Sequence, residues 1–276
     1  MSFRPDRPPP RVMGIVNATP DSFSDGGRFL DPGAALAHAR RLIAEGAHIL
    51  DLGAESTRPG AEPVPAEVEI ERLVPLVRAI LAESDVAISV DTMKPEVARA
   101  AVAAGASIWN DVTALRHDPA SLDAAAEMDC EVVLMHMQGE PRTMQAEPRY
   151  DDVVGEVAAF LADRAEAALA AGVARGRIWL DPGVGFGKHM IRHNLPVLGG
   201  LARIVALGFP VLLGASRKSF IGALDGGAAP DARLGGSIAA ALAGAEAGVA
   251  AVRVHDVAET SQALKVWAAI RQAGGA

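Results

Sequence analysis

The chain has 276 residues, a formal net charge of -8 and an isoelectric point near 5.4. Binding to nucleic acid without sequence preference needs a surplus of lysine and arginine, so this acidic balance excludes it and favours a small-molecule partner. Half of the residues are apolar but only 4% are aromatic, which indicates a core built mainly from aliphatic side chains.

The N-terminal segment is rich in proline and has no apolar run of the kind found in signal peptides. We therefore expect residues 1–10 to form a flexible arm, residues 11–276 to form one domain, and the protein to be cytoplasmic. The most apolar stretch, 238–252, is interrupted by Glu246 and is too short for the ~20 residues of a membrane span. The single cysteine, Cys130, excludes an intramolecular disulfide and a cysteine-based zinc site.

Eight apolar runs with the character of strands follow this arm, and nearly every one ends on a polar residue. The runs are 12–16, 49–53, 87–90, 107–109, 132–135, 178–180, 211–214 and 251–252. The polar residues at or just after their ends are Asn17, Glu55, Asp91, Asn110, His136, Asp181, Ser216 and Arg253. This regularity predicts that the chemistry is collected at one edge of a sheet.

Helical patterns lie between these runs, at 33–45, 65–83, 95–104, 119–128, 151–171, 194–207, 234–247 and 256–272. Strands that alternate with helices are most simply parallel, and right-handed crossovers leave all their carboxyl ends facing one way. Dividing 276 residues by eight gives about 34 per unit, close to the ~30 or more of a strand with its crossover helix. We predict an α/β fold, a single (β/α)8 TIM barrel with the active site at the C-terminal ends of the strands.

Three connections that follow strands are longer or more polar than packing requires: 19–27, 56–63 and 181–188. The first is a polar, turn-rich candidate for a lid, and the second carries Arg58 among turn-forming residues. The third has glycines that would let the backbone approach a flat ligand, with Phe186 as its large apolar group. Any one of them could be an ordinary surface turn, but three on one rim favour a functional site.

Motifs at these strand ends resemble those of the dihydropteroate synthase family, and the resemblance covers almost the whole chain. The matching segments are 13–27, 55–60, 89–92, 110–111, 134–139, 181–188, 216–219 and 253–257. Ala18 stands where the family usually has valine, a loss of volume that changes no chemistry. The resemblance implies condensation of 6-hydroxymethyl-7,8-dihydropterin diphosphate with p-aminobenzoate, giving 7,8-dihydropteroate and pyrophosphate in folate synthesis. It also implies Mg²⁺, a homodimer and sensitivity to sulfonamides.

The same resemblance assigns the pterin to a deep pocket that contains Asp91, Asn110, Met135, Asp181 and Lys218. Asp181 would take the 2-amino and N3 edge, Asp91 and Asn110 other ring nitrogens, and Lys218 the carbonyl and N5 side. Asp91, Asp181 and Lys218 are also catalytic candidates, because the carboxylates would favour a cationic pterin. Two unpaired carboxylates in one mouth would be costly, so we expect a ligand with paired donors to relieve that conflict.

Asp51 lies in the apolar run 49–53, near the end of a predicted strand. We expect it to be structural, since a lone strand-end aspartate often caps a helix or pairs with a cation. The diphosphate needs a local cluster of positive charge in this acidic chain, and the residues that supply it on the predicted rim are Arg58, Arg217, Lys218, Arg253 and His255. The resemblance assigns it to Arg253 and His255, with Thr57 and Arg58 closing over it. His255 could alternatively be an ordinary surface histidine at a helix start.

Asn17 would coordinate Mg²⁺, because an amide oxygen is an acceptable hard ligand.

The residues that the resemblance assigns to p-aminobenzoate are Phe23, Thr57, Pro59, Phe186 and Ser219. Asp25 would order the lid near the amine and handle a proton. Phe186 could instead be ordinary packing. Phe23, Thr57 and Pro59 are the positions where a sulfonamide and the substrate would differ in bulk.

Two other classes of protein remain as alternatives. A pterin-binding methyltransferase would share the deep aspartate and asparagine positions but would have no need for Asn17 or for the motif 216–219. A non-catalytic pterin-binding paralogue should lose the charged rim or the first lid, and both are present in this sequence. Apolar helices near the C-terminus could pair in a dimer, although the barrel needs such faces as well.

Overall fold

The computed structural model describes residues 8–18, 32–55, 64–140 and 143–274. Within them, eight parallel strands form one sheet in the order β6-β5-β4-β3-β2-β1-β8-β7. A parallel bridge between Leu180 and Val211 joins β6 to the start of β7, so that the sheet curves back on itself as a barrel. The strands are β1 Arg11–Asn17, β2 Ile49–Gly53, β3 Ala87–Asp91, β4 Ile108–Asp111, β5 Glu131–Met135, β6 Ile178–Asp181, β7 Leu212–Leu213 and β8 Ala251–Val254.

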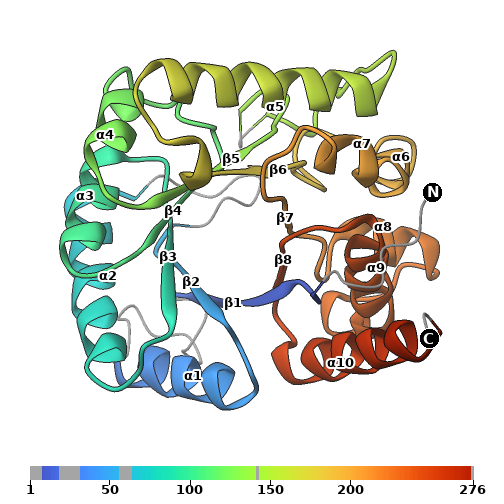
Figure 1. Ribbon diagram of the computed structural model, residues 1–276, viewed down its shortest axis with the longest axis horizontal. Coiled ribbons are helices and arrows are strands. Elements are labelled where there is room, and N and C mark those ends of the chain that lie inside the picture. The colour runs from blue at the N-terminus through green and yellow to red at the C-terminus, as the bar shows by residue number, and fades with distance from the viewer. Residues whose placement is uncertain (1–7, 19–31, 56–63, 141–142, 275–276) are drawn as a thin grey trace.

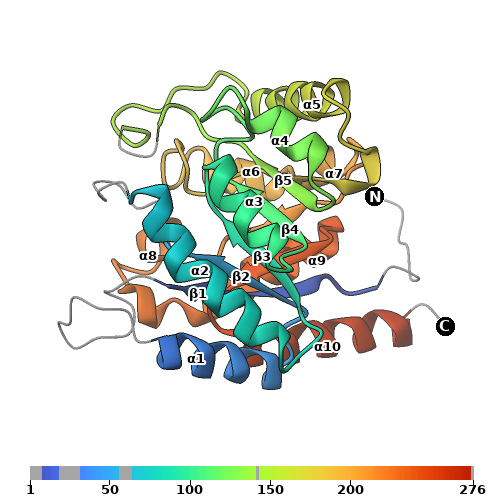
Figure 2. The ribbon, with the colours of Figure 1, turned by 90° about the vertical axis from the view of Figure 1, so that its left-hand side faces the viewer.

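Helices surround the strands (Figures 1 and 2), and the predicted (β/α)8 barrel is confirmed. Their bounds are α1 Pro32–Ala44, α2 Ala66–Leu81, α3 Pro95–Ala103, α4 Ser121–Glu127, α5 Val153–Ala170, α6 Asn194–Gly199, α7 Leu201–Val205, α8 Ser219–Leu224, α9 Leu234–Ala247 and α10 Val257–Gly274. Short 3-10 helices occupy Arg175–Arg177 and Pro230–Ala232.

A single helix was expected over 194–207. That expectation is wrong, because the segment forms two helices, α6 and α7, with Gly200 between them. A Cβ at Gly200 would lie 2.6 Å from Cγ1 of Val154, so the glycine lets α5 approach closely. A short helix, α8, begins at Ser219. No helix within the described ranges has the length and apolar character needed to cross a membrane.

The buried apolar residues form two layers, one between the strands and the helices and one inside the barrel. The main core lies between strands and helices and includes Leu42 of α1 and Val257 of α10. Gly14 of β1 faces this side, where a Cβ would lie 3.0 Å from Leu42 and 3.1 Å from Val257. Helices α1 and α10 therefore both close on β1 (Figure 1). Cys130 is buried in the same core, as predicted.

A second, smaller cluster fills the inside of the barrel, and we call it the plug layer. Its buried members are Met13, Ile49, Ile108, Val133, Trp179, Leu212 and Ala251. Successive side chains of a strand point to opposite faces, so the residue two positions later points inward again, one step nearer the carboxyl end. Counting two residues from the plug layer gives Ile15, Asp51, Asn110, Met135, Asp181, Gly214 and Arg253. The pleat therefore places four polar residues, Asp51, Asn110, Asp181 and Arg253, directly above the apolar plug layer.

Candidate active site

Arg253 of β8 is the centre of the deep part of the site. Its Nε donates to Oδ2 of Asp51 at 2.6 Å, and its Nη2 donates to Oδ2 of Asp91 at 3.0 Å. The amide of Asn110 lies 3.4 Å from both carboxylate oxygens of Asp51, which is fully buried. We call Asp51, Asp91, Asn110, Asp181 and Arg253 the polar layer. It combines three acids with one guanidinium and one amide.

This network corrects one expectation. Asp91 was expected to be unpaired until a ligand arrives, but Arg253 already pairs with it. The physical reason is the pleat, which points Arg253 inward beside Asp51 and Asp91. Burial and the charge of Asp51 raise the pKa of Asp91, although Arg253 acts in the opposite direction. Burial also opposes the charge of Arg253, yet Asp51 and Asp91 outweigh it and raise the pKa of the guanidinium.

Asp181, at the end of β6, is 5% exposed and accepts a hydrogen bond from the N–H of Gly183 at 2.7 Å. Burial raises the pKa of Asp181 to about 6, against the effects of the Gly183 N–H, Lys218 and Arg253. A Cβ at Gly214 would lie 3.8 Å from Oδ2 of Asp181 and 3.9 Å from Cδ of Arg253. The side chains of Asp181 on β6 and Arg253 on β8 thus both lie beside Gly214.

The loop 181–188 is held by a lysine that sequence reasoning missed. Lys188 is 1% exposed, and its ammonium donates to the carbonyl oxygens of Gly183 at 2.9 Å and Phe186 at 3.1 Å. It also lies 2.8 Å from Nδ1 of His136. Burial lowers the pKa of Lys188 to about 7 and that of His136 to about 3, so the imidazole is a neutral acceptor.

Lys218 and Phe186 form one wall of the mouth. The ammonium of Lys218 lies 4.0 Å from the centre of the Phe186 ring, within the range of a cation–π contact. Burial, with repulsion from Arg253, lowers the pKa of Lys218 to about 8, against the attraction of Asp181 and Asp91. Lys218 immediately precedes α8, and Arg217 before it has a left-handed backbone with a φ of 57°.

An apolar cluster adjoins this wall, and we call it the methionine cluster. It contains Val112, Met135, Met137 and Met144, with Met93 and Phe186 packed against it. The sequence pointed only to Met135 and Phe186, and Met137 could have been found because it follows Met135 by two residues. Methionine adapts its shape to a flat partner. Beside the polar layer, this cluster suits an aromatic ring that is apolar on its faces and polar at its edges.

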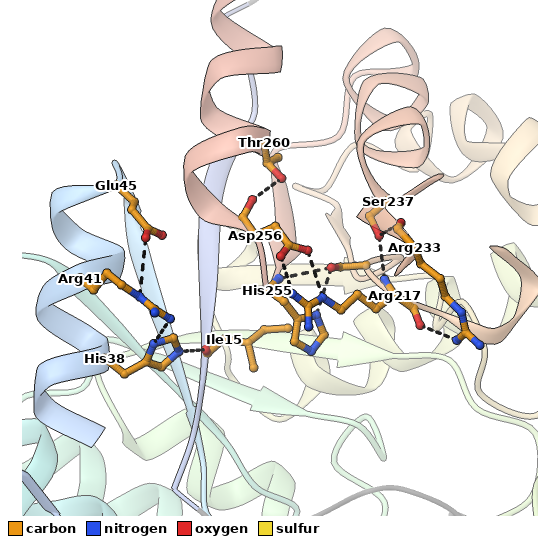
Figure 3. A network of polar contacts seen from close by, with 11 residues as sticks. Ile15, His38, Arg41, Glu45, Arg217, Arg233, Ser237, His255, Asp256 and Thr260 are labelled. Carbon is orange, nitrogen blue, oxygen red and sulfur yellow. Dashed lines mark hydrogen bonds and ion pairs between the residues drawn. The ribbon is translucent and has the colours of Figure 1, made fainter. Parts of the chain in front are cut away.

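The rim of the site carries His255, just after β8 (Figure 3), and Ser216 lies against it. Oγ of Ser216 accepts from the backbone N–H of His255 at 3.2 Å and lies 3.0 Å from Nδ1 of its ring. A serine oxygen can accept two hydrogens and donate one, so either ring tautomer satisfies this contact; where Ser216 donates to Nδ1, Nε2 carries the ring N–H. Burial, with Arg253 and Arg217 nearby, lowers the pKa of His255 to about 4.

Arg217 was expected among the positive charges that face an anion at this rim, but it pairs with Asp256 instead, with Nε 3.1 Å from Oδ2 (Figure 3). Its backbone is fixed by Ser237, which accepts from the Arg217 N–H at 2.9 Å, and by Arg233, which donates to the Arg217 carbonyl at 2.9 Å. Asn17 and His255 line one cavity together. Phe23, Asp25, Thr57, Arg58 and Pro59 lie outside the described residues.

Fold and site together define an α/β-barrel enzyme with a polar pocket for a flat heterocycle and hydrogen-bond donors at its rim. A model of the family described as pterin binding enzyme matches residues 13–255. The dihydropteroate synthase of Escherichia coli (strain K12) is 48% identical over 257 residues, which cover 93% of this chain and 90% of that protein. That of Neisseria meningitidis serogroup B is 50% identical over 95% of this chain and 93% of its own length.

The solved structure of Xanthomonas albilineans dihydropteroate synthase with 4-aminobenzoic acid has 52% sequence identity and a TM-score of 0.89, and the match covers 97% of this chain and 94% of that one. A structure of the same enzyme with 7,8-dihydropteroate has a TM-score of 0.86 at 50% identity, over 97% of this chain and 95% of that one. This chain belongs to the pterin binding enzyme family and, within it, to the dihydropteroate synthases, so the resemblance read from the sequence is confirmed.

Proposed function

We propose that this chain joins 6-hydroxymethyl-7,8-dihydropterin diphosphate to p-aminobenzoate, with release of pyrophosphate. The observation that carries the proposal is the polar layer, in which Asp181, Asp91 and Asn110 from three strands surround Arg253 beneath Lys218. The relatives from Xanthomonas albilineans, with 4-aminobenzoic acid or 7,8-dihydropteroate bound, support the same pair of substrates. Small molecules are therefore its partners.

The pterin ring presents adjacent N–H donors, a carbonyl and ring nitrogens along its edges, so it needs carboxylates, an amide and a cation. Asp181 takes the 2-amino and N3 edge, since Gly183 already satisfies its other oxygen. Asp91 and Asn110 bond other ring nitrogens, and Lys218 bonds the carbonyl and N5 side. Met135 and the methionine cluster pack against the faces of the ring.

The diphosphate lies at the rim, where Arg253, His255, Thr57 and Arg58 bind it. His255 suits this role in the tautomer in which Nδ1 accepts from Ser216, because Nε2 is then a neutral donor. Mg²⁺ fits at Asn17, a partly exposed amide that shares a cavity with His255. Within the described residues no group of three or more His, Cys, Asp or Glu could hold a metal alone, and Mg²⁺ commonly relies on substrate phosphates and water. When bound, Mg²⁺ would neutralise charge on the leaving group.

The reaction breaks the bond between the pterin methylene and the diphosphate oxygen, and the bonding electrons leave with pyrophosphate. Arg253 and His255 stabilise that developing negative charge, while Asp91 and Asp181 stabilise the positive charge left on the pterin. The amine of p-aminobenzoate then forms the new C–N bond and loses one proton, which Asp25 is placed by its motif to handle.

The ring of p-aminobenzoate packs between Phe23, Pro59 and Phe186, with Thr57 beside it and Ser219 receiving the carboxylate. The stem of Lys218, whose ammonium already lies over the Phe186 ring, contributes a further apolar contact. Dihydropteroate synthase from Yersinia pestis has been solved as a complex with a sulfonamide drug, at 44% identity and a TM-score of 0.89. We infer that sulfonamides compete with p-aminobenzoate in this chain too.

We further infer a cytoplasmic homodimer in which residues 1–10 form an arm and residues 11–276 form one domain. Leu224 of α8 and Val266 and Ile270 of α10 support the dimer, because they are large apolar side chains that are 54 to 66% exposed. Apolar surface of this kind is typical of helices that pair with a second copy. Size-exclusion chromatography with light scattering tests the dimer directly.

The activity is tested by incubating the purified full chain with the pterin diphosphate and Mg²⁺ and measuring pyrophosphate with and without p-aminobenzoate. We expect release that depends on p-aminobenzoate. A methyltransferase or a non-catalytic paralogue would give no such dependence, and that result would reject the proposal. In single-turnover assays, Asp181→Asn should slow the chemical step as well as weaken pterin binding, because the carboxylate stabilises the cationic pterin.

A further inference from the structure

A cavity of about 690 Å³ lies between α1 and the end of β8, and we call it the α1 cavity. Asn17 and His255, at the ends of β1 and β8, belong to its lining, and so do His38 and Arg41 of α1. The described α1 residues beside them are alanines, Ala34 and Ala37, whose small side chains leave the space open. The cavity therefore extends outward from the residues proposed to hold the diphosphate.

His38 fixes the orientation of Arg41 at the outer end of this cavity (Figure 3). Nε2 of His38 lies 3.2 Å from the carbonyl oxygen of Ile15, which can only accept, so Nε2 carries the hydrogen. Nδ1 of His38 is then the acceptor for Nη2 of Arg41 at 2.8 Å. Burial lowers the pKa of His38, which keeps the ring neutral in this arrangement.

The charge of Arg41 is weakly compensated. Glu45, the residue after the end of α1, lies 3.6 Å from Nε of Arg41, and the arginine side chain is 65% exposed. A pair with these properties contributes little stability in water. Arg217, on the opposite wall, is instead held by Asp256 through two nitrogens. Arg41 is thus held by His38 on the wall of the cavity, and only its weak ion pair with Glu45 competes with a ligand for its charge.

The donors around the cavity are complementary to a phosphate group. They are the imidazole of His255, whose Nε2 carries a hydrogen when Ser216 donates to Nδ1, the amide of Asn17 and the guanidinium of Arg41. Arginine binds phosphate oxygens through paired N–H groups, and neutral imidazole N–H groups add directed bonds. No carboxylate belongs to the lining of the cavity among the described residues.

We propose that the α1 cavity binds the pyrophosphate product after the bond to the pterin has broken, with Arg41 as its outer ligand. The inference rests on the proposed function. It gives α1 a part in product release: pyrophosphate moves from Arg253 and His255 toward Arg41 while the new C–N bond is completed at the mouth. Arg41 then controls how strongly the product is retained.

The test measures binding of pyrophosphate with Mg²⁺ to the full chain by calorimetry, and product inhibition by pyrophosphate in the assay above. Inorganic phosphate with Mg²⁺ serves as a second probe, which separates a general phosphate site from one for the diphosphate. Arg41→Met removes the outer ligand. Arg40→Met is the matched control, because Arg40 is the neighbouring residue on α1 and pairs on the surface with Glu83, 2.7 Å from its Nε. Glu45→Gln removes the carboxylate that competes for Arg41.

Arg41→Met should raise the dissociation constant and the inhibition constant of pyrophosphate about five- to tenfold, as expected for one charge-assisted contact. Its KM for p-aminobenzoate should not change. Glu45→Gln should tighten pyrophosphate binding, and Arg40→Met should leave it as in the wild type. Equal pyrophosphate affinities of Arg41→Met and Arg40→Met would overturn the inference. Such a result in an enzyme that releases pyrophosphate normally would leave the proposed function intact.

Failure of the proposed function has a different signature. In that case Arg41→Met would still weaken pyrophosphate binding, but the wild-type chain would release no pyrophosphate from the pterin diphosphate. The inference about the cavity would stand and the proposed reaction would be rejected. Weaker binding of inorganic phosphate than of pyrophosphate, with the same loss in Arg41→Met, would support a site that spans both phosphoryl groups. Binding of inorganic phosphate alone would overturn the assignment of the cavity to the diphosphate product.

Discussion

Arg253 and Asp51 are separated by 202 positions in the chain, yet Nε of Arg253 lies 2.6 Å from Oδ2 of Asp51. The arginine is on the last strand and the aspartate is on the second, and β1 alone lies between those strands in the sheet. Asp51 is fully buried and also lies beside the amide of Asn110. A single carboxylate therefore orients both the central cation and a proposed pterin ligand.

Asp51→Asn should destabilise the protein and weaken pterin binding. Breaking a buried ion pair by removing one partner leaves the other charge uncompensated, at a cost of about 3 kcal/mol. Arg253 would then be drawn more strongly to Asp91, which would leave that carboxylate less available to a ligand. Urea unfolding and KM for the pterin diphosphate measure the two effects. Glu83→Gln, which breaks the exposed pair with Arg40, is the control and should barely change either quantity.

Gly183→Ala should unfold the loop that carries Asp181. Gly183 has a φ of +64°, and a Cβ there would lie 1.9 Å from the carbonyl oxygen of His136, so the backbone would have to move. The cost should exceed about 2 kcal/mol, because strain from the left-handed backbone adds to the clash. Thermal unfolding and pterin affinity should both fall. Gly176→Ala is the matched control, since a Cβ at Gly176 meets nothing within 4 Å, and wild-type values for both variants would contradict the prediction.

The strand ends could be predicted because each apolar run is followed by a change of residue type that a parallel barrel requires. Counting two residues from Ile49 to Asp51, or from Trp179 to Asp181, already gives the inward faces. What could not be predicted is which buried charges neutralise one another. Arg253 was assigned to an anion and Asp51 to structure, yet they pair, because their distance depends on the closure of the barrel. Lys188 was missed because a lysine in a loop normally faces water.

Lys188→Met should reduce the dependence of stability on pH in the alkaline range. The ordinary pKa of lysine is near 10.5, and burial lowers that of Lys188 to about 7. Between these values the unfolded chain binds a proton at this residue that the folded chain does not bind. The free energy of unfolding therefore rises with pH from about 7 to about 10, by up to ~1.4 kcal/mol per pH unit for this group.

Urea titrations at pH 7 and pH 9.5 measure this slope. In Lys188→Met it should be smaller than in the wild type, while Lys218, with its pKa lowered to about 8, still contributes. Lys265→Met removes an exposed lysine of α10 and controls for the loss of one positive charge. Identical slopes in Lys188→Met and the wild type would contradict the prediction, because they would mean that the Lys188 ammonium stays charged beside the carbonyl oxygens of Gly183 and Phe186.

Pterin affinity should pass through a maximum between about pH 6 and pH 8. Asp181 must be ionised to accept two N–H groups, and burial raises its pKa to about 6, so affinity falls as the pH drops below that value. Lys218 must be protonated to donate to the carbonyl side, and its pKa is lowered to about 8, so affinity falls again above that value. Calorimetric titration with a pterin that lacks the diphosphate measures both limbs without turnover.

Each limb of this profile belongs to a particular residue and can be removed separately. Asp181→Asn should bind more weakly at every pH and lose the acid limb, while Lys218→Met should lose the alkaline limb and keep the acid one. Asp91 is the competing candidate for the acid limb, because burial and Asp51 raise its pKa as well. The pKa of Asp91 remains raised, to about 7, even though the positive charge of Arg253 beside it favours the ionised form. An acid limb that persists in Asp181→Asn and disappears in Asp91→Asn would transfer the role to Asp91.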